Sequence, residues 1–309
     1  MRGSDRPDLT DRLEYAALTS VLAVLRASGT EGSGILARGL GRFVARCVPL
    51  RRRVALENLA LAFPDSTDGE RRAIYRSMIE NLGAVLGDFA RMVGSPAAVR
   101  DALVMDHPEY IRELHETGGG ITLTAHYGNW EALGAAAVSL GDTTMLGARQ
   151  RNPLVERMFS EYRARLGVEA VSVRSGLRPV VRALKRGRVV ASLADQDGGR
   201  DGYFIDFFGR PASVQPGLFR LAARLGVPVV AGFALRTEDG WRGEIHPPWR
   251  PAPAEGEKAV EREARKLAVA FTRLVEEYVR RRPDHWFWVH RRWKTRPPGE
   301  AQTTPPRGR

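Results

Sequence analysis

Cysteine is almost absent from the 309-residue chain, which contains only Cys47. A single cysteine excludes an intramolecular disulfide and any zinc site built from several thiolates. We expect Cys47 to be a small apolar residue packed on a helix, without a chemical role. The chain also lacks the Gly-x-Ser-x-Gly motif that carries the serine nucleophile of α/β-hydrolases. With no role expected for Cys47, we predict neither a serine nor a cysteine nucleophile.

Long apolar segments are missing too. The first apolar run, residues 16–25, is ten residues long, whereas about twenty are needed to cross a bilayer. Acidic residues precede it, unlike the start of a secretory signal, so we expect no targeting segment. Residues 35–50 alternate arginines with apolar residues at helical spacing. This pattern fits a helix lying among lipid headgroups and equally an ordinary helix packed on the domain.

Lysine is scarce: only four of the 48 basic residues are lysines, so the formal net charge of +12 comes mainly from arginine. Guanidinium groups bind phosphates and carboxylates through paired hydrogen bonds. Composition leaves three kinds of partner open, namely nucleic acid, anionic lipid and an acidic carrier protein.

The segment 118–131 carries the main chemical signal. Three glycines precede a short apolar, β-branched run at 121–125, and the run ends at His126. Glu131 follows five residues later, at the head of an alanine-rich helix predicted over 132–140. We expect His126 at the carboxyl edge of a buried strand and Glu131 in the first helical turn.

The spacing of His126 and Glu131 suggests a general base. A carboxylate that accepts from one ring nitrogen fixes the tautomer, and the other nitrogen is then free to take a proton from a hydroxyl near neutral pH. An acceptor with a hydroxyl group is therefore the first hypothesis. A hydrogen-bonded structural histidine is the alternative.

Helices and strands alternate after this segment, which is typical of a layered α/β domain. Strands are predicted at 143–147, 168–173, 189–194, 227–235 and 241–246, and helices at 153–166, 177–186, 218–225 and 257–282. We divide the chain into a disordered tail at 1–11, a helical region at 12–95, an α/β domain at 96–295 and a disordered tail at 296–309.

Ligands collect beyond the carboxyl ends of the strands in an open α/β sheet. Arg149, Asp195 and Asp197 all follow predicted strands, as His126 does, so these residues are candidates for one site. The two aspartates lie in a glycine-rich stretch, and a solvated turn or a cation loop is the alternative there.

Two arginine-rich segments have open alternatives. Arg163 belongs either to a substrate site or to a solvated helix face. Three tryptophans and several cations at 286–293 form either a stacking platform for nucleic acid or a core strand with its aromatic ends at a membrane interface.

Several of these segments resemble a known family. His-Tyr-Gly-Asn-Trp-Glu at 126–131 resembles the His-x4-Asp/Glu motif of the glycerolipid acyltransferase superfamily, and specifically its bacterial lipid A late acyltransferase branch. Other ordered resemblances to that branch lie at 52–64, 195–211 and 283–296, and they favour the membrane-interface interpretation of the tryptophans.

The resemblance implies a layered α/β/α acyltransferase fold with a mixed central sheet and an amino-terminal helical region that associates with a membrane. It implies transfer of a fatty acyl chain from an acyl carrier protein thioester to a 3-hydroxyacyl chain of a Kdo-lipid A precursor. The protein would lie peripherally or monotopically on the cytoplasmic face of the bacterial inner membrane. No metal and no cofactor beyond the thioester co-substrate are implied. The implied catalytic residues are His126 and Glu131, and the implied substrate-binding residues are Arg149, Arg163, Asp195 and Asp197.

Two other functions compete with this one. A related branch acylates another membrane lipid, such as a phosphatidylinositol mannoside, from acyl-CoA. A basic nucleic-acid-binding protein would explain the charge, but no recognised reading motif supports it, so we expect no nucleic-acid partner.

Overall fold

The computed structural model describes residues 7–95, 98, 103–238 and 240–299. Four helices come first: α1 (Leu9–Ala27), α2 (Gly29–Cys47), α3 (Arg52–Ala62) and α4 (Asp68–Gly94). Helix α1 begins directly after Asp8, whose side chain and that of Asp11 cap each other's backbone N–H groups. The tail predicted at 1–11 is therefore too long, because residues from Leu9 onward are helical.

A seven-stranded mixed sheet forms the centre of the molecule, as predicted. Its strand order is β1-β9-β8-β2-β5-β3-β4. Strands β1 and β9 run opposite to the other five, because β9 pairs antiparallel with β8 and parallel with β1. The strands are β1 (Leu103–Asp106), β2 (Gly120–Thr124), β3 (Thr143–Gly147), β4 (Glu169–Ser172), β5 (Val189–Leu193), β8 (Val229–Thr237) and β9 (Gly240–Ile245).

Helices cover both faces of this sheet and bury two separate hydrophobic cores. One face carries α6 (Glu109–Glu116), α7 (Trp130–Val138) and α8 (Pro153–Arg165), and the other carries α9 (Arg178–Lys185), α10 (Gly217–Leu225) and α11 (Glu257–Arg281). A separate hairpin of β6 (Tyr203–Phe207) and β7 (Arg210–Val214) packs with α11. The short helices η1 (Val173–Ser175) and η2 (Pro283–His285) complete the described elements.

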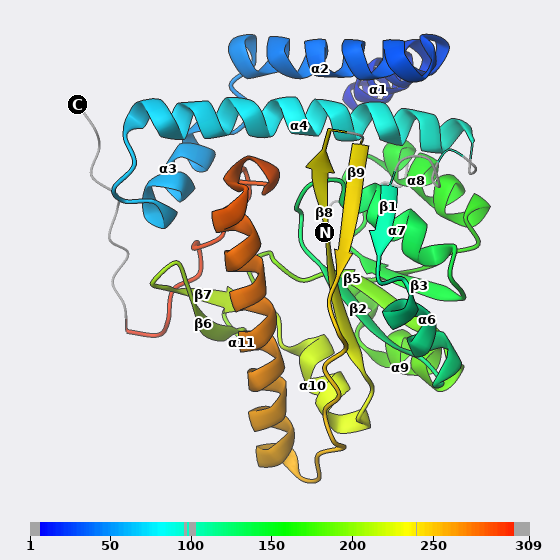
Figure 1. The fold of residues 1–309 in the computed structure, drawn as a ribbon, viewed down its shortest axis with the longest axis vertical. Coiled ribbons are helices and arrows are strands. Elements are labelled where there is room, and N and C mark those ends of the chain that lie inside the picture. Colours follow the sequence, from blue (N-terminus) through cyan, green and yellow to red (C-terminus); the bar gives the residue numbers. More distant parts are fainter. Residues whose placement is uncertain (1–6, 96–97, 99–102, 239, 300–309) are drawn as a thin grey trace.

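Helix α4 crosses the width of the molecule between α2 and the sheet (Figure 1). Glycines allow α2 and α4 to pack closely: a Cβ on Gly83 would lie 2.4 Å from the carbonyl oxygen of Ala37, and one on Gly87 would lie 2.7 Å from the Cβ of Ala37. Because its small residues face α4, α2 directs Ile35 and Phe43 outward, with 66% and 60% of each residue exposed. No helix among the described residues combines the length and apolarity that a bilayer-spanning segment requires.

Several sequence predictions need correction. Cys47 is exposed at the end of α2 rather than packed. Residues 286–293 form turns and a single bridge instead of a strand, and their tryptophans lie in the core rather than at an interface. Strand β1, helix α6 and the β6–β7 hairpin were not predicted. The proposed boundary at 95/96 adjoins residues outside the described ranges.

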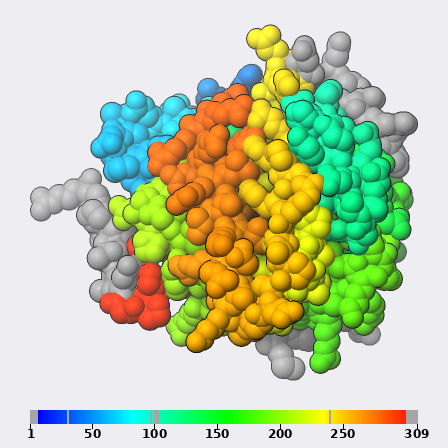
Figure 2. All heavy atoms as spheres, turned by 60° about the horizontal axis from the view of Figure 1, so that its bottom comes forward, coloured from blue at the N-terminus to red at the C-terminus, as the bar shows by residue number. Residues whose placement is uncertain are grey.

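The face formed by α11 and the segment after β9, orange and gold in Figure 2, has a shallow hollow. Its volume is about 470 Å³, and its lining includes His246, Trp249 and Arg273. None of the site residues predicted from the sequence lines this hollow.

Candidate active site

His126 and Asp195 meet because their strands are neighbours in the sheet. Strands β2 and β5 are parallel, and Thr124 pairs with Leu193 at their carboxyl ends. His126 lies two residues after Thr124, and Asp195 lies two residues after Leu193. The Nδ1 atom of His126 is 2.8 Å from Oδ1 of Asp195, and the backbone N–H of His126 donates to Oδ2 at 3.0 Å.

This pair has the electrostatics of an oriented base. Burial disfavours the charged imidazolium, but the adjacent Asp195 carboxylate outweighs it and raises the pKa of His126. Burial likewise opposes the charge of Asp195, yet His126 and the hydrogen bonds to the carboxylate lower the pKa of Asp195. With Nδ1–H donating to Asp195, Nε2 is left as the basic nitrogen. The side-chain amide of Gln196 lies 3.3 Å from Nε2.

Glu131 lies in the first turn of α7, as predicted, but it is not the hydrogen-bond partner of the histidine ring. Its Oε1 accepts from the indole of Trp130 at 3.2 Å. Burial raises the pKa of Glu131, against the opposing effect of Arg163. The prediction that Glu131 fixes the histidine tautomer was therefore wrong, because the strand register brings Asp195 to Nδ1. A catalytic role for Glu131 stays a prediction.

A cavity of about 670 Å³ lies beside the pair, between α7, α8 and the ends of β2, β3, β4 and β5. Thr124 and Trp130, which flank His126 in the sequence, both line it. The rings of His126 and Trp130 are 5.4 Å apart between centroids. His126 therefore lies at the margin of this cavity. Apolar lining residues include Met145, Leu146, Leu166, Ala191 and Leu193.

Arginines surround the cavity. Arg149 and Arg163 line it together with Arg174, which is not among the site residues predicted from the sequence. None of the three forms an ion pair with any residue that the structure describes. The charges of Arg149 and Arg174 are thus available to an anionic ligand, while Arg163 also acts on the carboxyl group of Glu131. The cavity combines an apolar interior with cationic groups.

Asp197 has a different position from the one predicted. Its side chain has no exposed surface, and its Oδ2 accepts from the hydroxyl of Thr295 at 2.9 Å and lies 3.5 Å from Nζ of Lys294. It does not line the cavity. The predicted substrate contact is therefore not supported, because the carboxylate anchors the carboxyl-terminal segment. Asp195 does not line the cavity either, because its carboxylate faces His126.

The tryptophans at the carboxyl end are buried in the core, and one of them contacts the candidate site. Trp286, Trp288 and Trp293 are at most 4% exposed, so they cannot form a stacking platform. The indole N–H of Trp286 donates to Oδ2 of Asp195 at 2.8 Å. No local sequence signal could have found this contact, which joins positions 91 residues apart. The His126–Asp195 pair was within reach, because adjacent parallel strands end at the same edge.

A layered α/β fold with a hydrogen-bonded histidine–aspartate pair beside an apolar, cationic cavity suits an acyltransferase that acts on a lipid hydroxyl. The sequence family described as bacterial lipid A biosynthesis acyltransferase matches residues 9–295. The chain therefore belongs to that family, and it is an O-acyltransferase.

The chain is 27% identical to the lipid A biosynthesis myristoyltransferase of Escherichia coli, over 87% of this chain and 82% of that protein. It is 28% identical to the lipid A biosynthesis lauroyltransferase of the same organism, over 84% and 85% of the two chains. A phosphatidylinositol mannoside acyltransferase of Mycobacterium tuberculosis is 28% identical, over 52% of this chain and 63% of that protein.

Proposed function

We propose that the protein transfers a fatty acyl chain from an acyl carrier protein thioester to a hydroxyl of a membrane glycolipid, specifically the 3-hydroxyacyl chain of a Kdo-lipid A precursor. The observation that carries this proposal is the His126 ring, fixed by Asp195 at Nδ1, at the margin of the arginine-lined cavity. Membership of the lipid A acyltransferase family and the names of the relatives support the acceptor.

The chemistry needs one base and no covalent enzyme intermediate. Nε2 of His126 takes the hydroxyl proton as the oxygen attacks the thioester carbonyl. The tetrahedral intermediate collapses, the carbon–sulfur bond breaks, and the departing thiolate takes the proton back from the imidazolium. Asp195 stabilises the imidazolium between these steps, and the more distant charge of Glu131 acts in the same direction. No metal or further cofactor takes part.

The cavity arginines suit a phosphorylated substrate. Arg149, Arg163 and Arg174 would hold phosphates of the acceptor or the phosphopantetheine of the carrier, because guanidinium groups pair with phosphate oxygens. The apolar lining residues would cover the acyl chain. The acidic carrier protein would be attracted by the same excess of positive charge.

Helices α1 and α2 supply a surface for membrane attachment. Of the twelve large apolar side chains that are exposed among the described residues, eight lie between residues 9 and 50. On α2, Ile35 and Phe43 share the exposed surface with Arg46, a combination that fits a helix lying among anionic headgroups. We propose peripheral attachment to the cytoplasmic face of the inner membrane.

The test is mass spectrometry of lipids after purified protein is incubated with acyl carrier protein thioesters and a Kdo-modified tetra-acylated lipid A precursor. The proposal predicts a gain of one acyl chain, lost with His126→Ala. The second candidate, acylation of phosphatidylinositol mannoside from acyl-CoA, is supported by the mycobacterial relative. Product from that pair of substrates alone would keep the chemistry and change the acceptor.

A further inference from the structure

Trp286 is buried beside the candidate catalytic pair, with 2% of its surface exposed. Its indole N–H donates to Oδ2 of Asp195 at 2.8 Å, the same oxygen that accepts from the backbone N–H of His126. Oδ1 of Asp195 is left facing Nδ1 of the histidine ring at 2.8 Å. The two donors on Oδ2 therefore fix the plane of the carboxylate, which a single bond to the histidine ring would leave free to rotate.

The segment that carries Trp286 is itself paired with the backbone of the catalytic turn. The N–H of Phe287 donates to the carbonyl of His126 at 2.9 Å, and the N–H of Gly128 donates to the carbonyl of His285 at 2.8 Å. Tyr127 and Trp286 form an antiparallel bridge between these bonds. The position of the indole is thus coupled directly to the position of the histidine.

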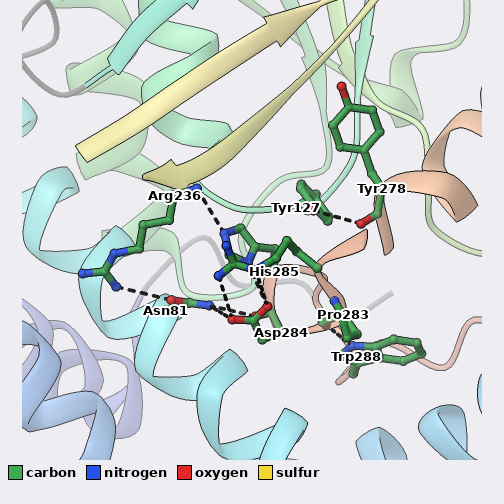
Figure 3. Close-up of polar contacts among 9 residues, drawn as sticks. Asn81, Tyr127, Arg236, Tyr278, Pro283, Asp284, His285 and Trp288 are labelled. Atoms are coloured by element: carbon green, nitrogen blue, oxygen red, sulfur yellow. Dashed lines mark hydrogen bonds and ion pairs between the residues drawn. The ribbon is translucent and has the colours of Figure 1, made fainter. Parts of the chain in front are cut away.

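A partly buried polar network anchors this segment on its other side (Figure 3). Asn81 of α4 donates to Asp284 at 3.0 Å, and Asp284 lies 3.1 Å from Nδ1 of His285. Nε2 of His285 accepts from the backbone N–H of Arg236 in β8 at 3.1 Å. Helix α4 and strand β8 therefore hold the segment that places Trp286.

We infer that Trp286 is a positioning residue for acyl transfer: its indole N–H holds the Asp195 carboxylate so that Oδ1 orients the His126 base. This inference rests on the proposed function. It assigns Trp286 no contact with substrate, because Trp286 does not line the cavity.

The inference predicts a change in the titration of His126. Without the indole donor, the negative charge on Asp195 is less stabilised, so the imidazolium gains a stronger partner and the pKa of His126 rises. The other charged or titratable groups that face the pair are Glu131 from α7 and, from the carboxyl-terminal segment, His290 and Arg292. None of them is altered by a change at position 286.

Trp288 provides a matched control for Trp286→Phe. Trp288 is also fully buried, and its ring packs edge to face on Trp286 with 4.6 Å between the ring centroids. Its indole N–H donates to the carbonyl of Pro283 at 2.7 Å. Both Trp→Phe changes remove a buried indole and one hydrogen bond. Only the change at 286 removes a donor from the carboxylate.

The experiment compares Trp286→Phe with Trp288→Phe in the full-length chain, by the pH profile of kcat/KM and by histidine NMR titration of His126. We expect Trp286→Phe to lower kcat on the order of tenfold or more, the size expected for a lost hydrogen bond to a charged group. The acid limb of the profile and the His126 titration should both move to higher pH. Trp288→Phe should lower the stability of the fold but leave the pKa of the acid limb of kcat/KM at its wild-type value.

Equal pH behaviour in the two folded variants would overturn the inference. If Trp286→Phe does not fold, the benzothienyl analogue of tryptophan at position 286, in which sulfur replaces the indole N–H, keeps the shape and gives the same comparison. Full turnover by His126→Ala would instead contradict the proposed function. An inactive His126→Ala with an unchanged limb in Trp286→Phe would reject the role of Trp286 alone.

Discussion

His126 and the carboxylate of Asp195 are joined by two hydrogen bonds, one from Nδ1 of the imidazole to Oδ1 at 2.8 Å and one from the histidine backbone N–H to Oδ2 at 3.0 Å. Each residue lies two positions after the end of its strand, and the two strands, β2 and β5, are parallel neighbours whose ends are paired. The carboxylate five residues after the histidine, Glu131, bonds instead to its neighbour Trp130. The two carboxylates therefore have different positions: Asp195 contacts the histidine ring, and Glu131 lines the cavity.

Asp195→Asn is expected to lower kcat by about 10² to 10⁴, because the histidine loses both its fixed tautomer and the charge that stabilises the imidazolium. The acid limb of the pH profile should move to lower pH. Glu131→Gln, the control, should shift the limb less, since Glu131 acts on His126 only through its charge. Full activity of Asp195→Asn, with a collapse in Glu131→Gln, would reverse the two assignments.

The raised pKa of His126 also predicts the pH dependence of the wild-type enzyme. General-base catalysis requires neutral imidazole, so activity should rise with pH through a pKa above about 6.5, the ordinary value for histidine. A kcat/KM profile between pH 5 and 9 checks this. A pKa below about 6.5 for the acid limb of this profile would contradict the pairing of His126 with Asp195.

Arg163→Gln is expected to raise KM for a phosphorylated acceptor or carrier about tenfold or more with a smaller change in kcat, because a hydrogen bond between ions is lost in substrate binding. Arg165→Gln is the control, since Arg165 lies on the same helix outside the cavity. Steady-state kinetics at two ionic strengths measures the effect. The same KM in both variants would remove Arg163 from the binding site.

Phe43→Asp is expected to reduce binding to anionic vesicles at least several-fold, because it replaces an exposed apolar side chain of α2 with a charge that anionic headgroups repel. Val104→Asp is the control: Val104 is 71% exposed, but it lies on β1. Vesicle flotation at low and physiological salt provides the measurement. Equal flotation of the two variants would exclude α2 as the attachment surface.

His290 predicts an acid-sensitive fold. Burial lowers the pKa of His290 to about 4, and its neutral Nε2 accepts from the backbone N–H of Asp197. In the unfolded chain it titrates near 6.5, so the stabilising effect of the neutral form is present above that pH and is lost as pH falls toward 4. The loss should stay below roughly 3 kcal/mol, which is the full shift at about 1.4 kcal/mol per pKa unit, because solvent screens the partly exposed ring. His290→Gln keeps a hydrogen-bond acceptor but does not titrate, so the free energy of unfolding in urea should depend less on pH between about 6.5 and about 4 in this variant. The same pH dependence in wild type and variant would contradict the prediction.

Local patterns in the sequence determined most elements of the fold. The predicted strand at 143–147 matches β3, and the helix predicted at 257–282 matches α11 within one residue. The helix has a strong 3.6-residue periodicity over 25 residues, and the strand is a short run that contains two β-branched residues, so local sequence patterns were enough to predict both. Strand β1 is four residues long, and the sequence of β6 does not show its alternating burial because Phe204 stands at an outward position. Strand β7 begins with Arg210 and Pro211 and has no alternation, so neither β1 nor the hairpin was predictable in this way.

The fold class, the family and the position of His126 at a strand end could be predicted from the chain, because each depends on residues that are close together in it. Three contacts depend on the folded arrangement instead: the bond of Asp195 to the histidine, the bond of Trp286 to Asp195, and the bond of Asp197 to the carboxyl-terminal segment. These contacts join residues 69 to 98 positions apart. Strand order and register bring His126 to Asp195, and the fold of the carboxyl-terminal segment brings Trp286 and Thr295 to the two aspartates. Local spacing in the sequence encodes neither.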